Sequence, residues 1–522
     1  MKEKQINSQY VFLFFLFLTI SVSVYIITLC GHNEAVGFLS DDAIFLMLAE
    51  IYSPWYAAQL PVFDFLLQHN RFPPLYPLLL GLFGVDSDSF YLASLFTVIF
   101  FNLSLIAIYF WLRRNQQTRL HSILTLFILV LLPSTHIFIY ELWSEFLYIL
   151  LVYCVFFMIS KSEINFQQWL LISLLVALSV LSKAIGVTLL IAYAFEVLYR
   201  KPENFLFLIL VALSPLLINL FTSINNTRSY PAEFVQYFGQ VHMDDYLYIL
   251  SDRFEILFQA FVWQFGIFRL ESISYLTYLI YIPLIILFMY ALCIRLIEMK
   301  IDSIYTLLFI SVIILWPYDD IHYVSRFIYP LMPLYFFYNL IAVQKISNHF
   351  FSNGKLFYLY FIVILCLLLP AMIEIAGKQN YLDGTALEKY STNREWVLSK
   401  DRHFAIHNLE KQKYTLEFLR EIKLHIPANE CVLGIQSPLI MLHSKRISGV
   451  LPDAAATDDE FFRITDLCNF IISFNFSDIE EKYPAFYPMD RIKNKDKYVY
   501  RPKYLSDDVN KPAIAYLAEK QK

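Results

Sequence analysis

Two adjacent carboxylates, Asp41 and Asp42, are the residues of this sequence best placed to do acid–base chemistry. Ser40 before them is a favourable helix N-cap, and apolar residues recur after them at helical spacing. The positive end of a helix dipole favours an ionised carboxylate. We expect Asp41 to accept a proton from a nucleophile and Asp42 to support it. The alternative is that both aspartates only complement the dipole.

Three basic residues could bind a phosphate group: Arg71, Lys183 and Arg326. A guanidinium can give a phosphate two charge-assisted hydrogen bonds, and an ammonium supplies a compact positive charge. Each residue also has a plainer interpretation. Arg71 could be an interfacial anchor, Lys183 could snorkel from a turn between two apolar segments, and Arg326 could pair with Asp319 or Asp320.

Other polar residues stand near these in the sequence or at the ends of apolar segments. Six of them are candidates for binding an acceptor or supporting the site: Tyr76, Glu141, Glu145, Asp319, Asp320 and His322. No pair of acidic or histidine residues has the spacing of metal ligands. The sequence therefore favours an interfacial polar network over a metal site.

The composition predicts a membrane protein. Of 522 residues, 58% are hydrophobic and 16% are charged, whereas a soluble chain carries about a quarter charged residues. The apolar residues fall into about eleven runs, many of them near the length that crosses a bilayer. The expected spans are 10–30, 88–112, 120–139, 143–160, 166–182, 184–199, 204–222, 274–294, 302–317, 326–343 and 355–376. A net charge of −5 gives no reason to expect a nucleic-acid partner.

Lysine and arginine are more frequent in alternate loops, which the positive-inside rule assigns to the cytoplasm. This assignment places the N-terminus inside. Residues 1–376 form a transmembrane domain with outer loops 31–87 and 223–273, and residues 377–522 form a soluble extracytoplasmic domain. The alternation of apolar residues predicts a small α/β fold for that domain, with a helix near 412–424 and strands at 431–435 and 469–474. We expect Cys431 and Cys468 there to be free buried thiols rather than a disulfide.

At these positions the chain resembles the GT-C membrane glycosyltransferases that use polyprenyl-phosphate sugars. That group includes the protein O-mannosyltransferases and the aminoarabinose transferases that modify lipid A. The matching elements are the acidic pair before a helix, Arg71 before a proline-rich turn, Ser144-Glu145, Lys183-Ala184-Ile185-Gly186, and the run Arg326 to Pro333. Asn70 stands where metal-binding members often have glutamate, so no metal is carried over, although a divalent metal is left open.

The resemblance implies a GT-C-like fold and an inverting transfer from a polyprenyl-phosphate sugar to a hydroxyl or amine of a glycan, lipid or protein. Asp41 and Asp42 would be catalytic, and Arg71, Lys183 and Arg326 would bind the donor phosphate. It also implies a multi-pass protein of a bacterial inner membrane that acts at the outer face. A transporter and a non-catalytic scaffold that binds a lipid-linked sugar are the alternatives. Mostly apolar mid-span positions disfavour transport.

Overall fold

The computed structural model describes most of the chain outside several connecting and terminal segments. The described residues are 36, 41–56, 61–69, 72–139, 141–222, 246–266, 275–316, 321–350, 355–379, 402–434, 436–450, 457–474, 498–504 and 513–520. They fall into two compact units. The first contains residues 1–28, 71–76 and 95–377, and the second contains residues 29–70, 77–94 and 378–522.

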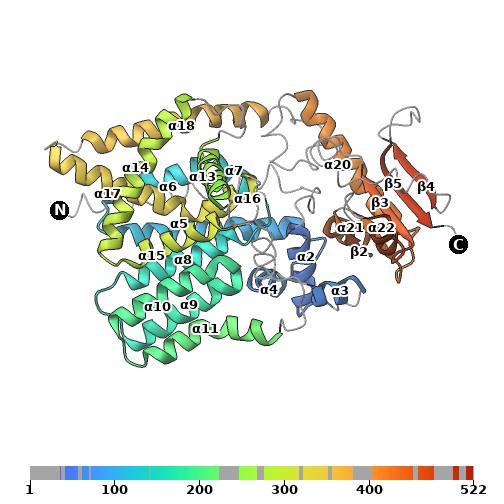
Figure 1. Cartoon of the computed structure of the whole chain (residues 1–522), viewed down its shortest axis with the longest axis horizontal. Helices are drawn as coiled ribbons and strands as arrows, with labels where there is room; N and C mark the ends of the chain where they lie inside the picture. Colours follow the sequence, from blue (N-terminus) through green and yellow to red (C-terminus); the bar gives the residue numbers. More distant parts are fainter. Residues whose placement is uncertain are drawn as a thin grey trace. The chain divides into compact units, whose positions relative to one another are not determined.

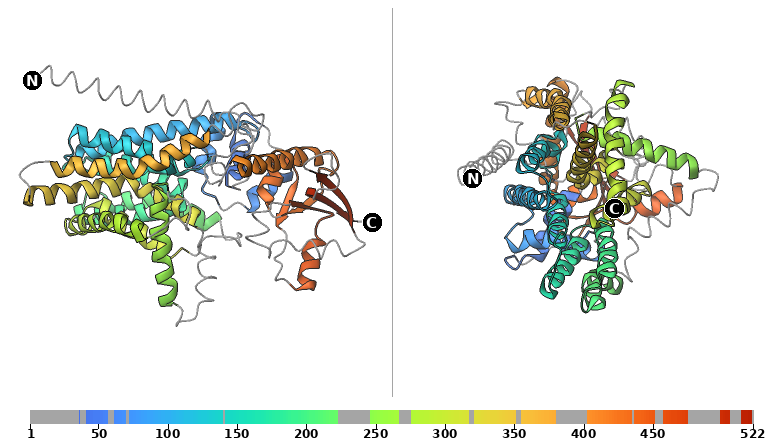
Figure 2. Two further views of the ribbon diagram at one scale, coloured as in Figure 1. Left: turned by 90° about the horizontal axis from the view of Figure 1, so that it is seen from above. Right: turned by 90° about the vertical axis from the view of Figure 1, so that its left-hand side faces the viewer.

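The first unit is helical, and its long helices run alongside one another (Figure 2). Its main helices are α5 (Phe90–Arg114), α6 (Arg119–Leu131), α7 (Pro133–Phe138), α8 (Glu145–Ile159), α9 (Phe166–Ser182), α10 (Val187–Arg200), α11 (Phe205–Thr222), α13 (Tyr246–Trp263), α14 (Tyr275–Ile297), α15 (Ile301–Ile314), α16 (Ile321–Ile328), α17 (Met332–Phe350) and α18 (Lys355–Gln379). Two short 3₁₀ helices, η1 (Ala184–Gly186) and η5 (Tyr329–Leu331), precede α10 and α17. Helix α5 begins in the second unit.

Four stretches of the described helices are long and apolar enough to cross a bilayer. They are Phe90–Arg114, Thr277–Ile297, Ile321–His349 and Leu356–Ile375, of 25, 21, 29 and 20 residues. Shorter apolar helices correspond to other predicted spans. The chain is thus a polytopic α-helical membrane protein, as its composition predicted. The predicted span 10–30 lies outside the described residues.

Two predicted spans differ from the structure in a physically explicable way. The segment 120–139 is not one helix, because α6 ends at Leu131 and α7 begins at Pro133. Proline cannot donate the backbone hydrogen bond of a helix interior, and it disfavours helical conformation in the residue before it. The predicted span 326–343 begins earlier, at Ile321, and includes the 3₁₀ turn at Tyr329–Leu331.

Several tyrosine hydroxyls inside the helical unit form hydrogen bonds within it. Tyr148 bonds to Tyr305 at 3.0 Å, and the Tyr153 hydroxyl donates to the Pro330 carbonyl at 3.3 Å. The Tyr329 hydroxyl lies 2.7 Å from the Thr135 hydroxyl. Because hydrocarbon offers no hydrogen bonds, such internal pairs make it possible to bury polar aromatic side chains between apolar helices.

The second unit contains a five-stranded mixed sheet. Its strands are β1 (Cys431–Gly434), β2 (Ile447–Val450), β3 (Phe470–Phe474), β4 (Tyr498–Tyr504) and β5 (Ala513–Lys520), in the order β2-β1-β3-β5-β4. Strand β1 is parallel to β2 and β3, and β5 is antiparallel to β3 and β4. Helices α20 (Arg402–Ile422), α21 (Ser437–Ser444) and α22 (Asp458–Thr465) complete this α/β region (Figure 1).

The core of the sheet region joins α20 and α21 to the central strands. It is a cluster of buried apolar residues: Leu416, Phe418, Leu419, Ile422, Ile426, Val432, Leu439, Ile440, Phe470, Ile472 and Leu517. The apolar residues of α20 recur every three or four positions, so they form one stripe that packs on the sheet. The small α/β fold expected from the sequence is therefore present, with α20 starting earlier than predicted.

The expectation of free thiols at Cys431 and Cys468 is wrong. The two residues form a disulfide. Cys431 begins β1 and Cys468 comes just before β3, and these strands are neighbours in the sheet. Parallel pairing brings the starts of the two strands together, although 37 positions separate the two cysteines in the sequence. Disulfides persist in oxidising compartments.

Candidate functional site

A buried cluster in the helical unit brings together Glu145, Lys183 and Arg326, three residues selected from the sequence. The Lys183 ammonium nitrogen lies 2.5 Å from Glu145 Oε1. Arg326 donates to the same oxygen through Nε, and its Nη2 lies 3.5 Å from Glu145 Oε2. Relative exposures are 0% for Glu145, 7% for Lys183 and 6% for Arg326. The cluster is therefore an ion triad withdrawn from solvent.

Aromatic rings lie against both cations of this triad. The guanidinium carbon of Arg326 is 3.8 Å from the ring centroid of Trp143, and Lys183 Nζ is 4.8 Å from that of Phe327. A cation over an aromatic face is attracted by the ring quadrupole, more strongly where water is excluded. A role for Trp143 could not be predicted from the sequence, because its contact with Arg326 depends on how α16 packs near the start of α8.

Local structure explains how Glu145 and Lys183 are positioned. Glu145 is in the first turn of α8, where the helix dipole favours an anion. Lys183 ends α9 in an extended conformation, and its carbonyl accepts a hydrogen bond from the Gly186 N–H at 2.8 Å. A Cβ at Gly186 would lie 2.6 Å from the Ser179 carbonyl oxygen, so only glycine fits this turn against α9.

Arg326 is held by the contacts of α16. Gln264 Nε2 donates to the Ser325 carbonyl at 2.8 Å, and the Ser325 hydroxyl donates to the Ala260 carbonyl at 3.3 Å. Both partners are in or just after α13, which lies in the segment predicted as outer loop 223–273. Arg326 is thus positioned by backbone contacts on the residue before it, and among the described residues Glu145 pairs with it. Its pairing with Asp319 or Asp320, considered from the sequence, falls outside the described part of the chain.

Lys183 and Arg326 are the two cations of the triad, and Glu145 is its carboxylate. Removing ions from water is costly unless their charges are balanced and their hydrogen bonds are made, so each member depends on its partners. Guanidinium and ammonium groups are also the side-chain groups that bind anionic oxygens through charge-assisted hydrogen bonds.

Glu141 and His322 form a second buried pair in the same unit. Their side chains approach to 4.0 Å, between His322 Nε2 and Glu141 Oε1, and both are less than a tenth exposed. The rings of Phe138, Trp143 and Trp263 lie around His322. Trp143 therefore contacts both this pair and Arg326, which links two groups that the sequence named separately.

Tyr76 is buried in the helical unit and packs within it. Its hydroxyl lies 3.0 Å from Thr97 Oγ1, and its ring contacts Phe100. Both partners belong to α5, so Tyr76 fixes the start of α4 (Leu75–Leu82). Its proposed role in binding an acceptor stays a prediction.

Asp41 and Asp42 lie together in the first turn of α2 (Asp41–Tyr52), in the second unit. Asp42 is 5% exposed, and its Oδ1 accepts a hydrogen bond from the Ala43 N–H at 2.9 Å. Asp41 is half-buried. The two carboxyl groups are therefore in different environments. Asp42 binds the backbone at the helix start, whereas Asp41 retains more access to water.

The sequence did not indicate that α21 of the sheet region packs on α2. His443 Nε2 lies 2.8 Å from the Val36 carbonyl oxygen, and Lys445 Nζ lies 3.5 Å from Asp88 Oδ1. Within the same unit, a Cβ at Gly81 of α4 would lie 2.3 Å from the Ala49 carbonyl oxygen. These contacts place α2 among α4 and the C-terminal helices, and they join residues far apart in the sequence.

Some of the candidate residues fall outside the described part of the chain: Ser40, Asn70, Arg71, Asp319 and Asp320. Among the residues that the structure describes, no group of three or more histidine, cysteine, aspartate or glutamate side chains could hold a metal ion. The roles of Arg71, Asp319 and Asp320 stay predictions.

The chain matches no protein-family model and no curated protein. Solved structures similar to it include ArnT from Cupriavidus metallidurans in the apo state, with 12% identity, a TM-score of 0.47, and coverage of 96% of this chain and 97% of that chain. ArnT bound to undecaprenyl phosphate has 11% identity and a TM-score of 0.45, with the same coverage. The Archaeoglobus fulgidus oligosaccharyltransferase in the apo form has 12% identity and a TM-score of 0.47, covering 90% of this chain and 71% of that chain.

ArnT is a lipid A aminoarabinose transferase, and both kinds of protein have the GT-C fold that the sequence motifs resemble. Similarity at this level does not carry function from one chain to another, because one fold hosts many activities. Function must be argued from the residues of this chain.

Proposed function

We propose that this protein is a membrane glycosyltransferase that moves a sugar from a polyprenyl-phosphate donor to a hydroxyl or amine on the outer face of the membrane. The observation that carries the proposal is the buried triad of Glu145, Lys183 and Arg326. Two cations on one carboxylate, in a unit of apolar helices, suit a ligand that combines a phosphate with a hydrocarbon tail.

In the proposed reaction, the acceptor oxygen or nitrogen attacks the anomeric carbon of the sugar from the face opposite the phosphate. The bond between that carbon and the phosphate oxygen breaks, and the configuration inverts. The phosphate leaves with the bonding electron pair as polyprenyl phosphate. Because a phosphate is a stable anion, the leaving group needs no general acid, and Arg326 and Lys183 would stabilise the charge that grows on it.

Asp41 would take the proton from the attacking hydroxyl or amine. The N-terminus of a helix favours an anion, and a positioned carboxylate can act as a general base. Asp42, which caps the backbone, would hold the start of α2. The active side of the protein and the sheet region would face the extracytoplasmic space, a placement supported by the loop charges and by the disulfide.

The direct test is turnover by the purified protein in lipid nanodiscs. A panel of polyprenyl-phosphate sugars is supplied with candidate acceptors, and release of polyprenyl phosphate is measured. We expect at least one donor to be consumed, and we expect Arg326→Lys to weaken turnover because an ammonium cannot make the two parallel hydrogen bonds of a guanidinium. Arg326→Ala should reduce turnover further. Full activity of Arg326→Ala would remove this residue from the site.

A transporter or a binding scaffold would give different results in the same experiment. Either would bind the lipid-linked sugar without cleaving its bond to phosphate, so no polyprenyl phosphate would appear. Movement of an intact donor between leaflets would identify transport. Binding with neither cleavage nor movement would identify a scaffold, and both outcomes would overturn the proposed activity.

A further inference from the structure

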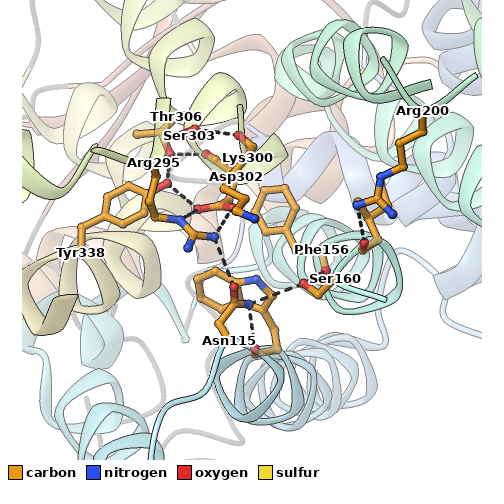
Figure 3. Close-up of polar contacts among 12 residues, drawn as sticks. Asn115, Phe156, Ser160, Arg200, Arg295, Lys300, Asp302, Ser303, Thr306 and Tyr338 are labelled. Carbon is orange, nitrogen blue, oxygen red and sulfur yellow. Dashed lines mark hydrogen bonds and ion pairs between the residues drawn. The ribbon is translucent and has the colours of Figure 1, made fainter. Parts of the chain in front are cut away.

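A polar cavity of about 460 Å³ lies at the opposite end of α8 from Glu145. Its walls come from the ends of α5, α8 and α10 and from the connection between α14 and α15. Figure 3 shows polar contacts made by residues of these elements, among them Asn115, Arg200, Arg295 and Asp302. Helix α8 has 15 residues, so the cavity is ~20 Å from the triad along this helix. The cavity is therefore separate from the proposed donor site.

The floor of the cavity is a rigid ion pair. Arg295 donates from Nε to Asp302 Oδ2 at 2.7 Å and from Nη2 to Oδ1 at 2.6 Å, and the Tyr338 hydroxyl donates to Asp302 Oδ2 at 2.8 Å. Arg295 Nη2 also reaches Asn115 Oδ1 at 3.2 Å. Arg295 and Asp302 are 8% and 3% exposed. The two hydrogen bonds between Arg295 and Asp302, together with the one from Tyr338 of α17, fix this floor in one arrangement.

One wall of the cavity is also held in place by hydrogen bonds, which Arg200 donates. Arg200 donates from Nε to Glu196 Oε1 at 2.6 Å, and its terminal nitrogens donate to the Lys161 and Ile159 carbonyls at 2.9 and 3.0 Å. Two of these three hydrogen bonds hold the end of α10 to the end of α8, and the third lies within α10. The cavity is thus bounded by preformed contacts, as a binding site must be to avoid ordering costs.

The lining carries an excess of positive charge. Its cations are Arg114, Arg200, Arg295 and Lys300, and its carboxylates are Glu196, Glu298 and Asp302. The pairs on Arg200 and Arg295 neutralise two of the cations. Arg114 and Lys300, both exposed, are the other two cations, and Glu298 is the third carboxylate. Lys300 also interacts electrostatically with Glu196, so the lining as a whole carries one net positive charge. An anion that enters the cavity would gain from Arg114 and Lys300.

Exposed apolar side chains belong to the cavity lining or lie next to it in the chain. Tyr199 and Met299 belong to the lining and are 70% and 47% exposed, and Ile297 near them in the chain is 83% exposed. A free anion would gain nothing from such groups, whereas the acyl chains of a lipid would cover them. The cations of the lining belong to loops that the positive-inside rule assigns to the cytoplasm. The cytoplasmic leaflet is the one that carries anionic lipids.

We propose that this cavity binds the phosphate headgroup of an anionic phospholipid from the cytoplasmic leaflet. The phosphate lies between Arg114 and Lys300, above the floor formed by Arg295 and Asp302. The acyl chains extend over Tyr199 and Met299. This site is distinct from the donor site, and its occupation does not depend on the proposed transfer reaction.

The test uses the purified full-length protein in detergent and measures the shift of its thermal unfolding midpoint with added phosphatidylglycerol, phosphatidylcholine or inorganic phosphate. We expect saturable stabilisation by phosphatidylglycerol only. The double variant Arg114→Gln/Lys300→Gln should weaken the apparent affinity for phosphatidylglycerol at least about tenfold, because each cation near anionic lipid contributes to binding. Sugar-transfer turnover in neutral lipid should be unchanged, which also shows that the variant is folded.

Lys345→Gln is the matched control, since Lys345 is an exposed lysine of α17 outside the cavity lining. It should bind phosphatidylglycerol as the wild type does. An equal loss in this control would show that general surface charge, and not the cavity, attracts the lipid. Equal stabilisation by phosphatidylcholine, or displacement of phosphatidylglycerol by inorganic phosphate at a similar concentration, would overturn the assignment to an anionic lipid.

Discussion

At the scale of single residues, Asp41 and Asp42 differ in what their carboxyl groups contact. Asp42 is buried and bonds to the Ala43 N–H, whereas Asp41 is half-buried. We expect Asp41→Asn to lower turnover about 10²–10⁴-fold, the usual contribution of a positioned base. If Asp41 stabilises the fold through the helix dipole, its loss should lower stability by at most about 1 kcal/mol. Turnover and thermal unfolding of the same preparation measure both effects.

Asp42→Asn is the matched control for that prediction. It keeps the shape of the side chain and an oxygen that can accept the Ala43 hydrogen bond, so its turnover should fall much less. Equal losses at the two positions would mean that the catalytic and capping roles are not divided in this way. Nearly normal turnover of Asp41→Asn would leave both residues as helix-dipole partners.

Glu145 offers a test of the triad that does not depend on activity. Glu145→Gln leaves Lys183 and Arg326 buried without their shared carboxylate, which should destabilise the protein by about 3–5 kcal/mol. Polyprenyl phosphate should raise the unfolding midpoint of this variant more than that of the wild type, because its phosphate would replace the lost negative charge. A smaller rise than in the wild type would argue against phosphate binding at the triad.

Glu417→Gln is the control for the Glu145 substitution. Glu417 pairs with Lys413 four residues earlier in α20, and the two side chains are 39% and 30% exposed. Pairs of this kind contribute about 0.3–0.5 kcal/mol, so the loss should be small. Polyprenyl phosphate should stabilise this variant and the wild type to the same extent.

The candidate residues were accessible from the sequence because charged side chains are rare among apolar segments, so each one stands out. Their partners were not accessible. Glu145 is 38 positions from Lys183 and 181 positions from Arg326, and no local pattern encodes such a contact. The role of Trp143 could not be predicted for the opposite reason. Aromatic residues are common throughout this chain, so the sequence does not distinguish one of them as functional.

At the scale of elements, the turn between α9 and α10 positions Lys183, and Gly186 makes the turn possible. Gly186→Ala would place a Cβ 2.6 Å from the Ser179 carbonyl oxygen, so the backbone must shift. We expect a loss of about 1–3 kcal/mol in stability, typical of overpacking, together with a weaker apparent affinity for the polyprenyl-phosphate donor. Titration of turnover against donor concentration separates this effect from a change in the chemical step.

The control for Gly186 is Ile191→Val, since Ile191 is 39% exposed on α10. Removal of one exposed methylene should change neither stability nor donor affinity measurably. If Gly186→Ala lost stability but kept the donor affinity of the wild type, the turn would be a packing element only, and the geometry of Lys183 would not depend on it.

Elements differ in how well the sequence predicts them. The apolar helices follow directly from hydropathy, and β1 and β3 follow from local periodicity. Strand β5 does not, since Ala513–Lys520 is rich in alanine, leucine, glutamate and lysine, which favour helix. It is a strand because it pairs with β3 and β4 on both sides. Tertiary pairing outweighs local propensity here.

At the scale of the whole molecule, the orientation of the chain across the membrane determines where the proposed chemistry occurs. The charge bias predicts that residues 377–522 lie outside. The disulfide between Cys431 and Cys468 supports the same side by an independent argument, because glutathione and thioredoxin keep thiols reduced in the cytosol. The two arguments rest on different residues, so one experiment on the cysteines tests the topology without using the loop charges.

That experiment uses a variant in which Cys431 and Cys468 are the only cysteines, produced in bacterial cells with an oxidising periplasm. The protein is denatured and treated with a polyethylene-glycol maleimide, which adds mass to each free thiol. We expect no shift in mass unless the protein is first reduced, because both thiols are in the disulfide. Additional replacement of Cys468 by serine frees Cys431, which should then react without reduction. If both thiols of the two-cysteine variant react without a reductant, the sheet region lies in a reducing compartment. The α2 carboxylates of the same unit would then have to be assigned to the cytoplasmic side.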